Sequence, residues 1–386
     1  MSLEGKLEIG TRNSCSQQKI QKKMNLLPEL WKEHVFEYLS LTHCTLIRDL
    51  FELPVKIDVV HSVVEFVPFA AKKILLPHHT YLYKDFVDDT LSVLQMPGNT
   101  TVKSLELLSV CTNLITLNFH SNDHIKSVTP LNCCKSLTEL NLWHARLTTL
   151  EPLKGLNLKG LYLNWSVLVS SIEPLKEHYS MECLVLGRNR KIKSISAIQK
   201  LTNLQRLDLN QNKKLAEIRL DSSKLRYLDL CMNKHVKTLE HVRFDSMIHL
   251  DLSNNTEIES LEPLRNCKTL KHLNLTQNDR IESIEPLRDC ALIRLYMSKN
   301  TKIESIDSLN CSNMICLRMD SNNRISSLNC FANCKLLTLF SMESNEQVTD
   351  FSPLDDCKRL FKENLSLFNS ESARRYLEKR PSAIYV

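Results

Sequence analysis

Hydrophobic residues recur along most of this chain in one short pattern. Segments such as LTNLQRLDLNQN and LKHLNLTQN share a nine-residue template, LxxLxLxxN, with apolar residues at its first, fourth and sixth positions. The template fits twelve times, at intervals of 21 to 23 residues, and its last position falls at Asn99, Asn122, Ala145, Ser166, Asn189, Asn212, Asn233, Asn255, Asn278, Asn300, Asn322 and Asn345. A fixed period of this length predicts a repeat protein.

Each repeat is expected to hold one short strand and one irregular return. The alternation within LxLx suits a strand with every second side chain buried. Apolar residues at steps of three around a proline, as in ESIEPLRDC after Asn278, suit a 3₁₀ turn. Because one repeat cannot bury its own leucines, we predict an α/β solenoid of about twelve stacked parallel strands with 3₁₀ or irregular returns, preceded by a small α-helical module.

Two further residue types recur for structural reasons. The template asparagine offers donors and an acceptor to backbone groups that a sharp turn leaves unpaired. Seven cysteines follow a template end by eleven or twelve residues and are expected to fill one equivalent buried slot, namely Cys111, Cys134, Cys267, Cys290, Cys311, Cys334 and Cys357. Since the chain holds no CxxC pair, we expect neither zinc binding nor thiol catalysis.

Composition and charge narrow the functional classes. With 386 residues, of which 42% are hydrophobic and 24% charged, the chain can bury a large core. Its six glycines form no phosphate-binding loop and no catalytic constellation stands out, so we expect no enzyme, cofactor or metal site. Residues 1–24 carry five cations against two acids and residues 358–386 seven against three, which leaves −1 of the net +6 in between. Nucleic acid binding is therefore not expected.

The amino-terminal residues bear on localisation. They show no cationic segment followed by an apolar stretch, and nowhere do eighteen apolar residues run together. We expect neither export nor membrane insertion. The fourteen cysteines are then expected to be reduced thiols in the cytoplasm or nucleus.

The template, its period and the proline-containing return resemble the leucine-rich repeat family, specifically the 22-residue type of phosphatase-regulatory subunits and bacterial internalins. The resemblance covers Leu91 to Cys357. It implies a horseshoe whose concave sheet grips a protein partner. Internalins are exported, so the expected absence of a signal peptide points away from that branch.

Outward-facing strand positions map the expected concave surface. In the third and fourth repeats, which both lack the template asparagine, outward strand positions are expected to hold Trp143, Tyr162 and Trp165, beside His144. These four residues are expected to contact a partner. The alternative is a degenerate repeat in which a tryptophan fills a packing gap. Later strands contribute further expected contacts, namely Arg206, Tyr227, His249, His272, Arg294 and Tyr296.

Three aspartates, Asp208, Asp229 and Asp251, follow one another at the same strand position of successive repeats. They are expected to repel one another unless a cation or a basic partner lies nearby. The alternative is that Leu-Asp-Leu is a common sequence motif in this type of repeat and that the three aspartates have no role in binding.

Residues 25–54 follow a helical period and predict two amphipathic helices. Their spacing of apolar pairs resembles an F-box, a module that docks on a Skp-type adaptor of a cullin-RING ubiquitin ligase. The resemblance assigns that contact to Leu27, Pro28, Val35, Phe36, Tyr38 and Leu39. The alternative is that the helices only cap the open leucine face of the first repeat.

The expected organisation is a disordered basic tail (1–24), an F-box-like helical module (25–66), a helical connector or N-cap (67–90), twelve repeats (91–357) and a C-terminal cap and tail (358–386). In the last segment, SESARRYLEKRP predicts a short helix stopped by Pro381. The combined interpretation is a non-enzymatic substrate-recognition subunit of a ubiquitin ligase. The alternative is a recognition or scaffold protein, similar to a phosphatase regulator or an assembly component, whose first helices are only a cap.

Overall fold

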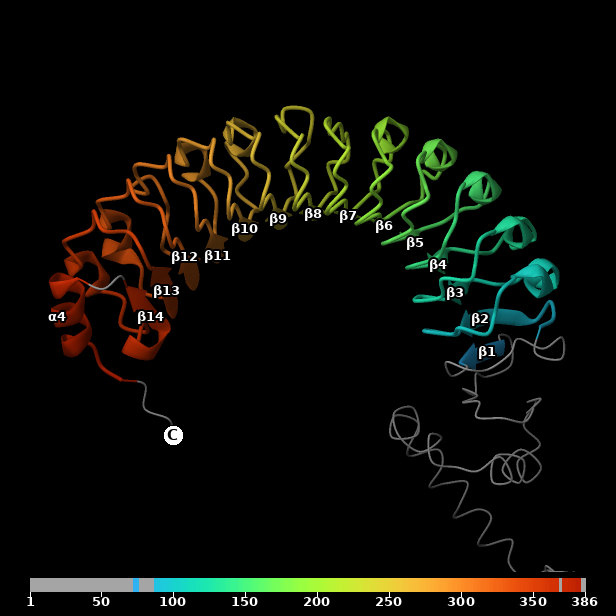
Figure 1. Ribbon diagram of the computed structural model, residues 1–386, viewed down its shortest axis with the longest axis horizontal. Coiled ribbons are helices and arrows are strands. Elements are labelled where there is room, and N and C mark those ends of the chain that lie inside the picture. Colours follow the sequence, from blue (N-terminus) through green and yellow to red (C-terminus); the bar gives the residue numbers. More distant parts are fainter. Residues whose placement is uncertain (1–71, 76–86, 368–369, 383–386) are drawn as a thin grey trace, which may run out of the picture.

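The computed structural model describes residues 72–75, 87–367 and 370–382, and of residues 72–75 it describes the backbone alone. These residues form an open arc with short strands along its inner side and returns along its outer side (Figure 1). We call each repeat a rung and number the rungs 1 to 12 by their template ends, from Asn99 to Asn345. The predicted horseshoe of leucine-rich repeats is confirmed.

One parallel sheet of fourteen strands, paired in chain order, lines the arc. The twelve predicted strands are β2 to β13, and β1 and β14 extend the sheet by one strand at each end. The strands are β1 Lys72–Leu75, β2 Leu91–Gln95, β3 Thr116–Asn118, β4 Glu139–Asn141, β5 Gly160–Tyr162, β6 Cys183–Val185, β7 Arg206–Asp208, β8 Tyr227–Asp229, β9 His249–Asp251, β10 His272–Asn274, β11 Arg294–Tyr296, β12 Cys316–Arg318, β13 Leu339–Met342 and β14 Leu365–Leu367.

Short 3₁₀ helices occupy many of the returns, as the spacing of three predicted. Proline stands in the first turn of six of them, where its missing N–H group has no partner to lose. The 3₁₀ helices are η3 Glu106–Val110, η4 Thr129–Cys133, η5 Glu151–Leu153, η6 Glu173–Leu175, η7 Ser196–Ile198, η8 Glu262–Leu264, η9 Glu285–Leu287, η10 Asn329–Asn333, η11 Ser352–Leu354 and η12 Lys362–Asn364.

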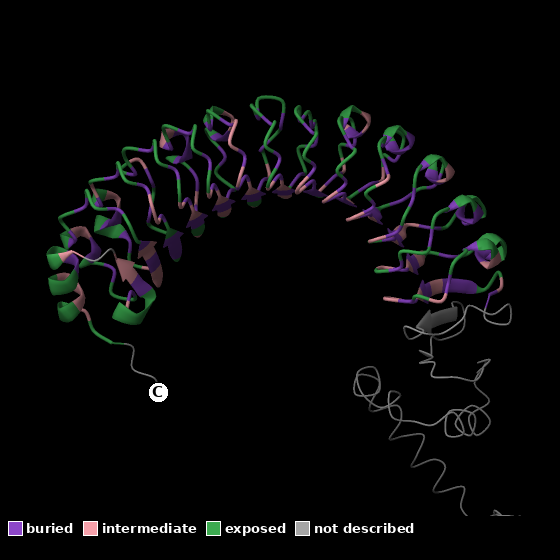
Figure 2. Ribbon diagram, viewed as in Figure 1, coloured by how far each residue is buried: buried purple, intermediate pink, exposed green. Residues whose placement is uncertain are grey.

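The core lies between the sheet and the returns and runs unbroken from rung to rung (Figure 2). Every apolar residue of the twelve templates is at most 2% exposed. Each buried leucine contributes about 2 kcal/mol to stability, and every rung relies on its neighbours to cover it. The seven predicted cysteines are all buried in this core, which confirms their role as apolar fillers.

Template asparagines tie the rungs together. The Asn255 amide donates to the carbonyl oxygens of Leu252 in its own rung (2.8 Å) and Leu230 in the preceding rung (2.9 Å). Its Oδ1 accepts from the backbone N–H of Asn233 at 2.8 Å. The same links continue without a break to Asn345, so the predicted structural role of the asparagine is confirmed.

The residue before each template end adopts a left-handed backbone conformation. These twelve residues have φ between 56° and 71°, and eleven of them are not glycine. They are Gly98, Ser121, His144, Trp165, Arg188, Gln211, Met232, Asn254, Gln277, Lys299, Ser321 and Ser344. Side chains disfavour this region, so the sharp turn after each strand is held against local preference by the stacked rungs.

The segments that flank the twelve rungs were predicted correctly at the C-terminal end only. Within the expected helical connector, residues 72–75 instead form β1, which pairs with β2, because an exposed sheet edge can accept another strand. At the other end the predicted helix is confirmed as α4, Glu371–Lys379, whose N-cap Ser370 accepts from the N–H of Ala373 at 3.0 Å. The F-box-like module, with all six of its expected adaptor contacts, lies outside the described residues.

Candidate functional site

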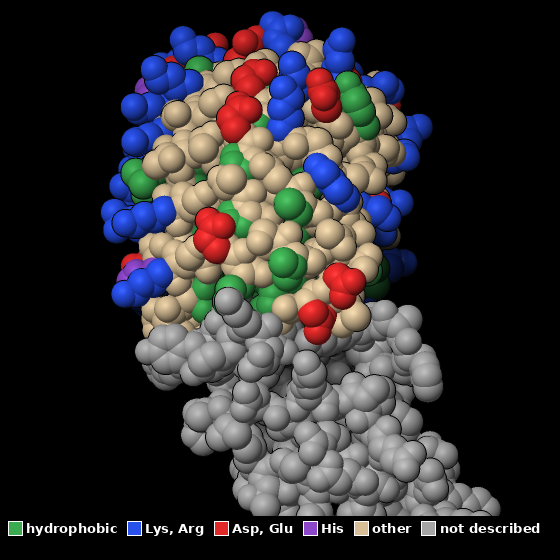
Figure 3. All heavy atoms as spheres, turned by 90° about the vertical axis from the view of Figure 1, so that its right-hand side faces the viewer, with side chains coloured by type: hydrophobic (Ala, Val, Ile, Leu, Met, Phe, Trp, Pro, Cys, Tyr) green, Lys and Arg blue, Asp and Glu red, His purple; other side chains and the backbone are tan. Residues whose placement is uncertain are grey.

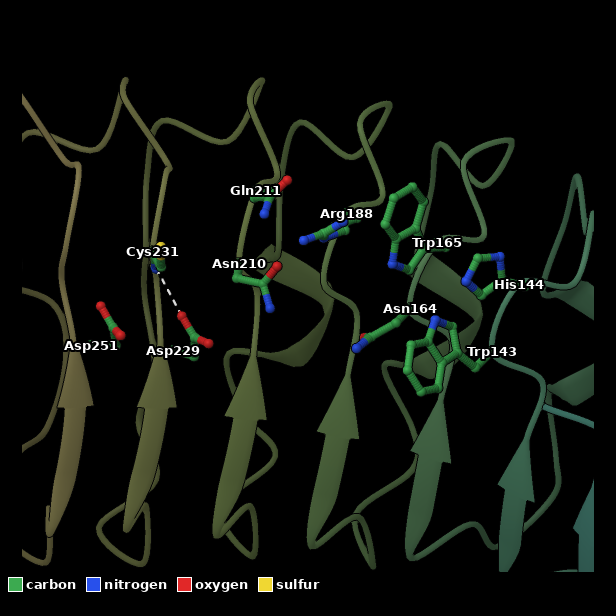
Figure 4. A pocket seen from close by; sticks show the side chains of 10 residues that line it. All are labelled: Trp143, His144, Asn164, Trp165, Arg188, Asn210, Gln211, Asp229, Cys231 and Asp251. Atoms are coloured by element: carbon green, nitrogen blue, oxygen red, sulfur yellow. Dashed lines mark hydrogen bonds between the residues drawn. The ribbon is translucent and has the colours of Figure 1, made fainter. Parts of the chain in front are cut away.

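A hollow of about 520 Å³ opens where strands β4 to β9 end, on the concave side of the arc (Figure 4). We call it the aromatic hollow. Two tryptophans and a histidine stand at one end of it and two carboxylates at the other, with amides and an arginine between them. Its lining consists of Trp143, His144, Asn164, Trp165, Arg188, Asn210, Gln211, Asp229, Cys231 and Asp251.

Ring stacking orders the aromatic end of the hollow. The rings of His144 and Trp165 lie nearly parallel with centroids 5.1 Å apart, and the Arg188 guanidinium carbon lies 4.3 Å from the Trp165 centroid. Trp143 contacts His144 at 5.6 Å and remains 40% exposed. A planar cation over an indole face gains about 0.5 to 1 kcal/mol. The group is therefore a rigid, partly exposed stack across three rungs.

The expected strand positions of the two tryptophans are wrong. Strands β4 and β5 end at Asn141 and Tyr162, so that Trp143 and Trp165 lie in the turns that follow. Trp165 occupies the left-handed position that His144 occupies one rung earlier. His144 and Trp165 therefore occupy equivalent positions in neighbouring rungs, which explains why their rings stack.

A small residue makes room for the floor of the hollow. Gly187 donates its N–H to Oδ1 of Asn164 at 2.8 Å. A Cβ atom at Gly187 would lie 2.7 Å from the Asn210 amide nitrogen, which is closer than real Cβ atoms come. Glycine at this position therefore lets the Asn210 side chain lie over the neighbouring rung.

The three aspartates lie side by side, as the template alignment predicted. Asp208, Asp229 and Asp251 are register partners on β7, β8 and β9. Each carboxylate accepts from the backbone N–H two residues further on; for Asp229 this donor is Cys231 at 2.9 Å. Burial, followed by the charges of the other two aspartates, raises the pKa of Asp229 to about 7. The acidic row therefore carries less than its full charge at neutral pH.

A second predicted row crosses the same strands closer to their beginnings. The Arg206 guanidinium carbon lies 3.8 Å from the Tyr227 ring centroid, and His249 and His272 stack with centroids 4.3 Å apart. Burial, followed by neighbouring positive groups, lowers the pKa of both histidines. These four residues and Arg294 are register partners on β7 to β11, so the predicted row is confirmed as a geometric unit.

Two predicted tyrosines lie apart from this row. Tyr162 ends β5, and burial raises the pKa of its hydroxyl. Tyr296 ends β11, where the Arg318 guanidinium carbon lies 5.9 Å from its ring centroid. Neither lines the aromatic hollow, so the predicted concave contacts divide between the hollow and the surrounding face.

Sequence reasoning missed half of the hollow. Its unpredicted members occupy the two positions directly before the template end, at which the repeats share no residue type: Asn164, Arg188, Asn210, Gln211 and Cys231. The signal was available in the alignment, because these positions coincide with those of Trp143 and Trp165 in their own rungs.

The hollow is suited to binding. Burial raises the pKa of the Cys231 thiol, which keeps it protonated at neutral pH. The histidine of the lining, His144, lies at the opposite end of the hollow from this thiol. Among the described residues, no three histidine, cysteine or carboxylate side chains converge as a metal site would require. Rings, amides and carboxylates can recognise a side chain or peptide group.

Comparisons with known proteins agree on the repeat and the fold. Residues 112–155 and 245–289 match a model of leucine-rich repeats in two copies. An internalin from Listeria monocytogenes, inlF, is 22% identical, with a TM-score of 0.68 over 84% of this chain and 93% of that protein. A leucine-rich repeat protein of Leptospira interrogans is 20% identical, with a TM-score of 0.54 over 78% and 85%. No curated protein sequence matches significantly. Among the described residues, no helix is long and apolar enough to span a membrane.

Proposed function

We propose that this solenoid of leucine-rich repeats is the recognition arm of a non-enzymatic adaptor, acting inside the cell, which holds a protein partner against its concave face. The observation that carries the proposal is the aromatic hollow. Trp143 is a large exposed ring held in the turn that follows β4, and large aromatic side chains of this type dominate protein interfaces. Many stacked rungs also provide a long binding surface with little conformational freedom to lose.

The chemistry of the hollow favours a partner side chain that carries a positive charge. Asp229 and Asp251 line one end, and no cation pairs with either of them among the described residues. An incoming lysine or arginine would supply the missing counter-charge at this end. The indole rings at the opposite end are placed to contact a second, apolar group of the same partner. Binding the lysine or arginine would also release the proton that Asp229 retains near pH 7.

The amino-terminal segment is proposed to tether this arm to a Skp-type adaptor of a cullin-RING ubiquitin ligase through its F-box-like residues. Tethering would raise the effective concentration of the captured protein near the ligase without any chemistry in this chain. One observation favours a second candidate, a recognition or scaffold protein without ligase attachment. β1 extends the sheet beyond rung 1, as an end cap does, so the segment before it could serve the same purpose.

Affinity capture with the full chain tests both parts of the proposal. The double variant Trp143→Ala, Trp165→Ala is expected to lose captured proteins that the wild type retains, by tenfold or more, because truncating an interface hot spot costs about 2 kcal/mol or more. The variant Val35→Lys, Phe36→Lys is expected to keep those proteins and to lose a purified Skp-type adaptor.

Tyr179→Ala is the matched control, because Tyr179 is 60% exposed and lies outside the hollow. Equal losses in the control and in the tryptophan variant would contradict a role of the hollow. A folded wild type that never binds the purified adaptor would leave the second candidate standing.

A further inference from the structure

Positive charge gathers on one set of turns. In each of rungs 5, 6 and 7, the four residues after the template end comprise three exposed side chains and one buried apolar residue. These segments read RKIK, KKLA and KHVK. Eight of their nine exposed side chains are basic, and we call them the basic strip: Arg190, Lys191, Lys193, Lys213, Lys214, Lys234, His235 and Lys237.

Equivalent positions in the next three rungs carry more acids than cations, five against two. They read TEIE, DRIE and TKIE in rungs 8, 9 and 10. Cations there pair with acids of the preceding rung, as in Arg280 with Glu257 at 3.1 Å and Lys302 with Glu282 at 2.8 Å. In the described part of the chain, no ion pair forms with any member of the basic strip. The uncompensated charge is therefore local to three rungs and is not a property of the repeat.

Backbone geometry holds the strip at a fixed spacing. The three turns are closed by the same hydrogen bond, for example from the N–H of Leu215 to the carbonyl oxygen of Asn212 at 2.9 Å. Bonds from Arg188 to Asn210 and from Gln211 to Cys231, both 2.7 Å, lock each rung to the next. Neighbouring rungs are about 4.8 Å apart at the sheet, so like charges stand in rows across about 10 Å.

The strip lies on the edge of the horseshoe, after the strands and beside the concave face. Lys and Arg side chains line both lateral edges of the molecule as seen in Figure 3. What distinguishes the three turns that carry the basic strip is the lack of acids among their twelve residues. A preorganised array of this kind attracts polyanions and gains by releasing their counter-ions.

We propose that the basic strip binds the phosphodiester backbone of a nucleic acid duplex. Six of its eight members are lysines, which contact anions as point charges, and such contacts suit the sequence-independent neutralisation of closely spaced backbone phosphates. Its exposed positions hold no tryptophan, tyrosine or phenylalanine ring on which an unpaired base could stack. The only exposed apolar residue is Ala216, which cannot anchor in a lipid bilayer.

This inference revises the expectation from net charge. The charge of −1 over residues 25–357 averages the strip with acidic rungs and so hides it. The strip also does not depend on the proposed adaptor function, because it uses none of the residues of the aromatic hollow.

Fluorescence anisotropy with a labelled 20-base-pair DNA duplex of mixed sequence tests the proposal. The full chain is compared with a strip variant, Lys191→Glu, Lys213→Glu, Lys214→Glu, Lys237→Glu. About four lost phosphate contacts are expected to weaken binding about 100-fold or more at 0.1 M salt. In the strip variant, the slope of log affinity against log salt concentration should become less negative by about 3 to 4.

The matched control makes the same change of charge at four exposed lysines outside the strip: Lys135→Glu, Lys154→Glu, Lys176→Glu, Lys200→Glu. Its affinity for the duplex is expected to stay within about threefold of the wild-type value. It keeps the basic tails, so equal losses in both variants would show diffuse attraction and overturn the proposal. A strip that binds polyglutamate or phosphatidylserine vesicles but no duplex would overturn it as well. A second strip variant with glutamines in place of glutamates guards against misfolding and should lose roughly half as much in log affinity.

Discussion

Single residues decide how firmly each rung is joined to the next. From Asn255 to Asn345, each template asparagine donates to two carbonyl oxygens and accepts from one N–H group that the sharp turn would otherwise leave unpaired inside the core. Rungs 3 and 4 lack it. There Ala145 offers no polar atom and the buried Ser166 hydroxyl has no partner. The same two rungs carry the tryptophans, so the asparagine links are missing where the aromatic end of the hollow is built.

Replacing Asn278 by alanine is expected to lower the free energy of unfolding by about 3 to 4 kcal/mol. The change removes its bonds to the carbonyl oxygens of Leu252 (2.9 Å) and Leu275 (2.8 Å) and leaves the Asn255 N–H without its acceptor. Urea unfolding followed by circular dichroism measures the loss. The exposed Asn323 provides a control, and Asn323→Ala should change the same quantity by less than about 0.5 kcal/mol. A similar loss of unfolding free energy in Asn278→Ala and Asn323→Ala would contradict a stabilising role of the asparagine links.

At the scale of single strands, the parallel register turns separate template positions into continuous rows. Asp208, Asp229 and Asp251 could be aligned from the sequence, because the template fixes their position within each rung. The turn residues could be aligned equally well, but their left-handed backbone could not be predicted from residues as different as Trp165 and Met232. Glycine would have given the usual signal, and only Gly98 does so.

The acidic row makes stability depend on pH. The folded pKa of Asp229 is about 7, above the value near 4 of an unfolded chain, so the protonated form favours folding. This contribution is complete below about pH 4 and is lost as the pH rises through 7. Asp229→Asn should therefore stabilise the protein by about 2 kcal/mol at pH 8 and by less than about 0.5 kcal/mol at pH 4. Asparagine can still accept from the N–H of Cys231.

Thermal unfolding at the two pH values measures this difference. Asp279→Asn is the control, because Asp279 is exposed on a turn of rung 9 and its replacement should matter little at either pH. An equal effect of Asp229→Asn at pH 4 and pH 8 would mean that packing, and not proton binding, governs the site.

At the scale of the whole molecule, the repeat pattern of the sequence predicted those features that recur in every rung or in many of them. The twelve rungs, their buried leucines, the asparagine links and the cysteine slot all follow from one template repeated along the chain. The strands at the ends, β1 and β14, escaped prediction because end rungs pair on one side only and need not follow the template. The hollow and the basic strip depend on neighbours across rungs, so they emerge only when equivalent turns are compared.

The cap at the C-terminal end should control how far unfolding spreads from that end. α4 buries Ala373 against the last rungs, and the Tyr376 ring lies 5.5 Å from the Phe351 ring. Arg380 donates to the carbonyl oxygens of Leu354 and Cys357, which lie in the return of rung 12. In a solenoid each rung contacts only its neighbours, so losing the cap should weaken the nearest rungs first.

Ala373→Arg is therefore expected to detach α4 and to speed amide hydrogen exchange about tenfold or more in rungs 11 and 12, because a long cation does not fit its buried position. Rungs 6 to 8 should exchange as in the wild type. Ser372→Arg, one residue away on the exposed side of α4, is the control and should leave all rungs unchanged. Uniformly faster exchange along the whole chain in Ala373→Arg would instead show that the rungs unfold as one cooperative unit and that the cap stabilises all of them together.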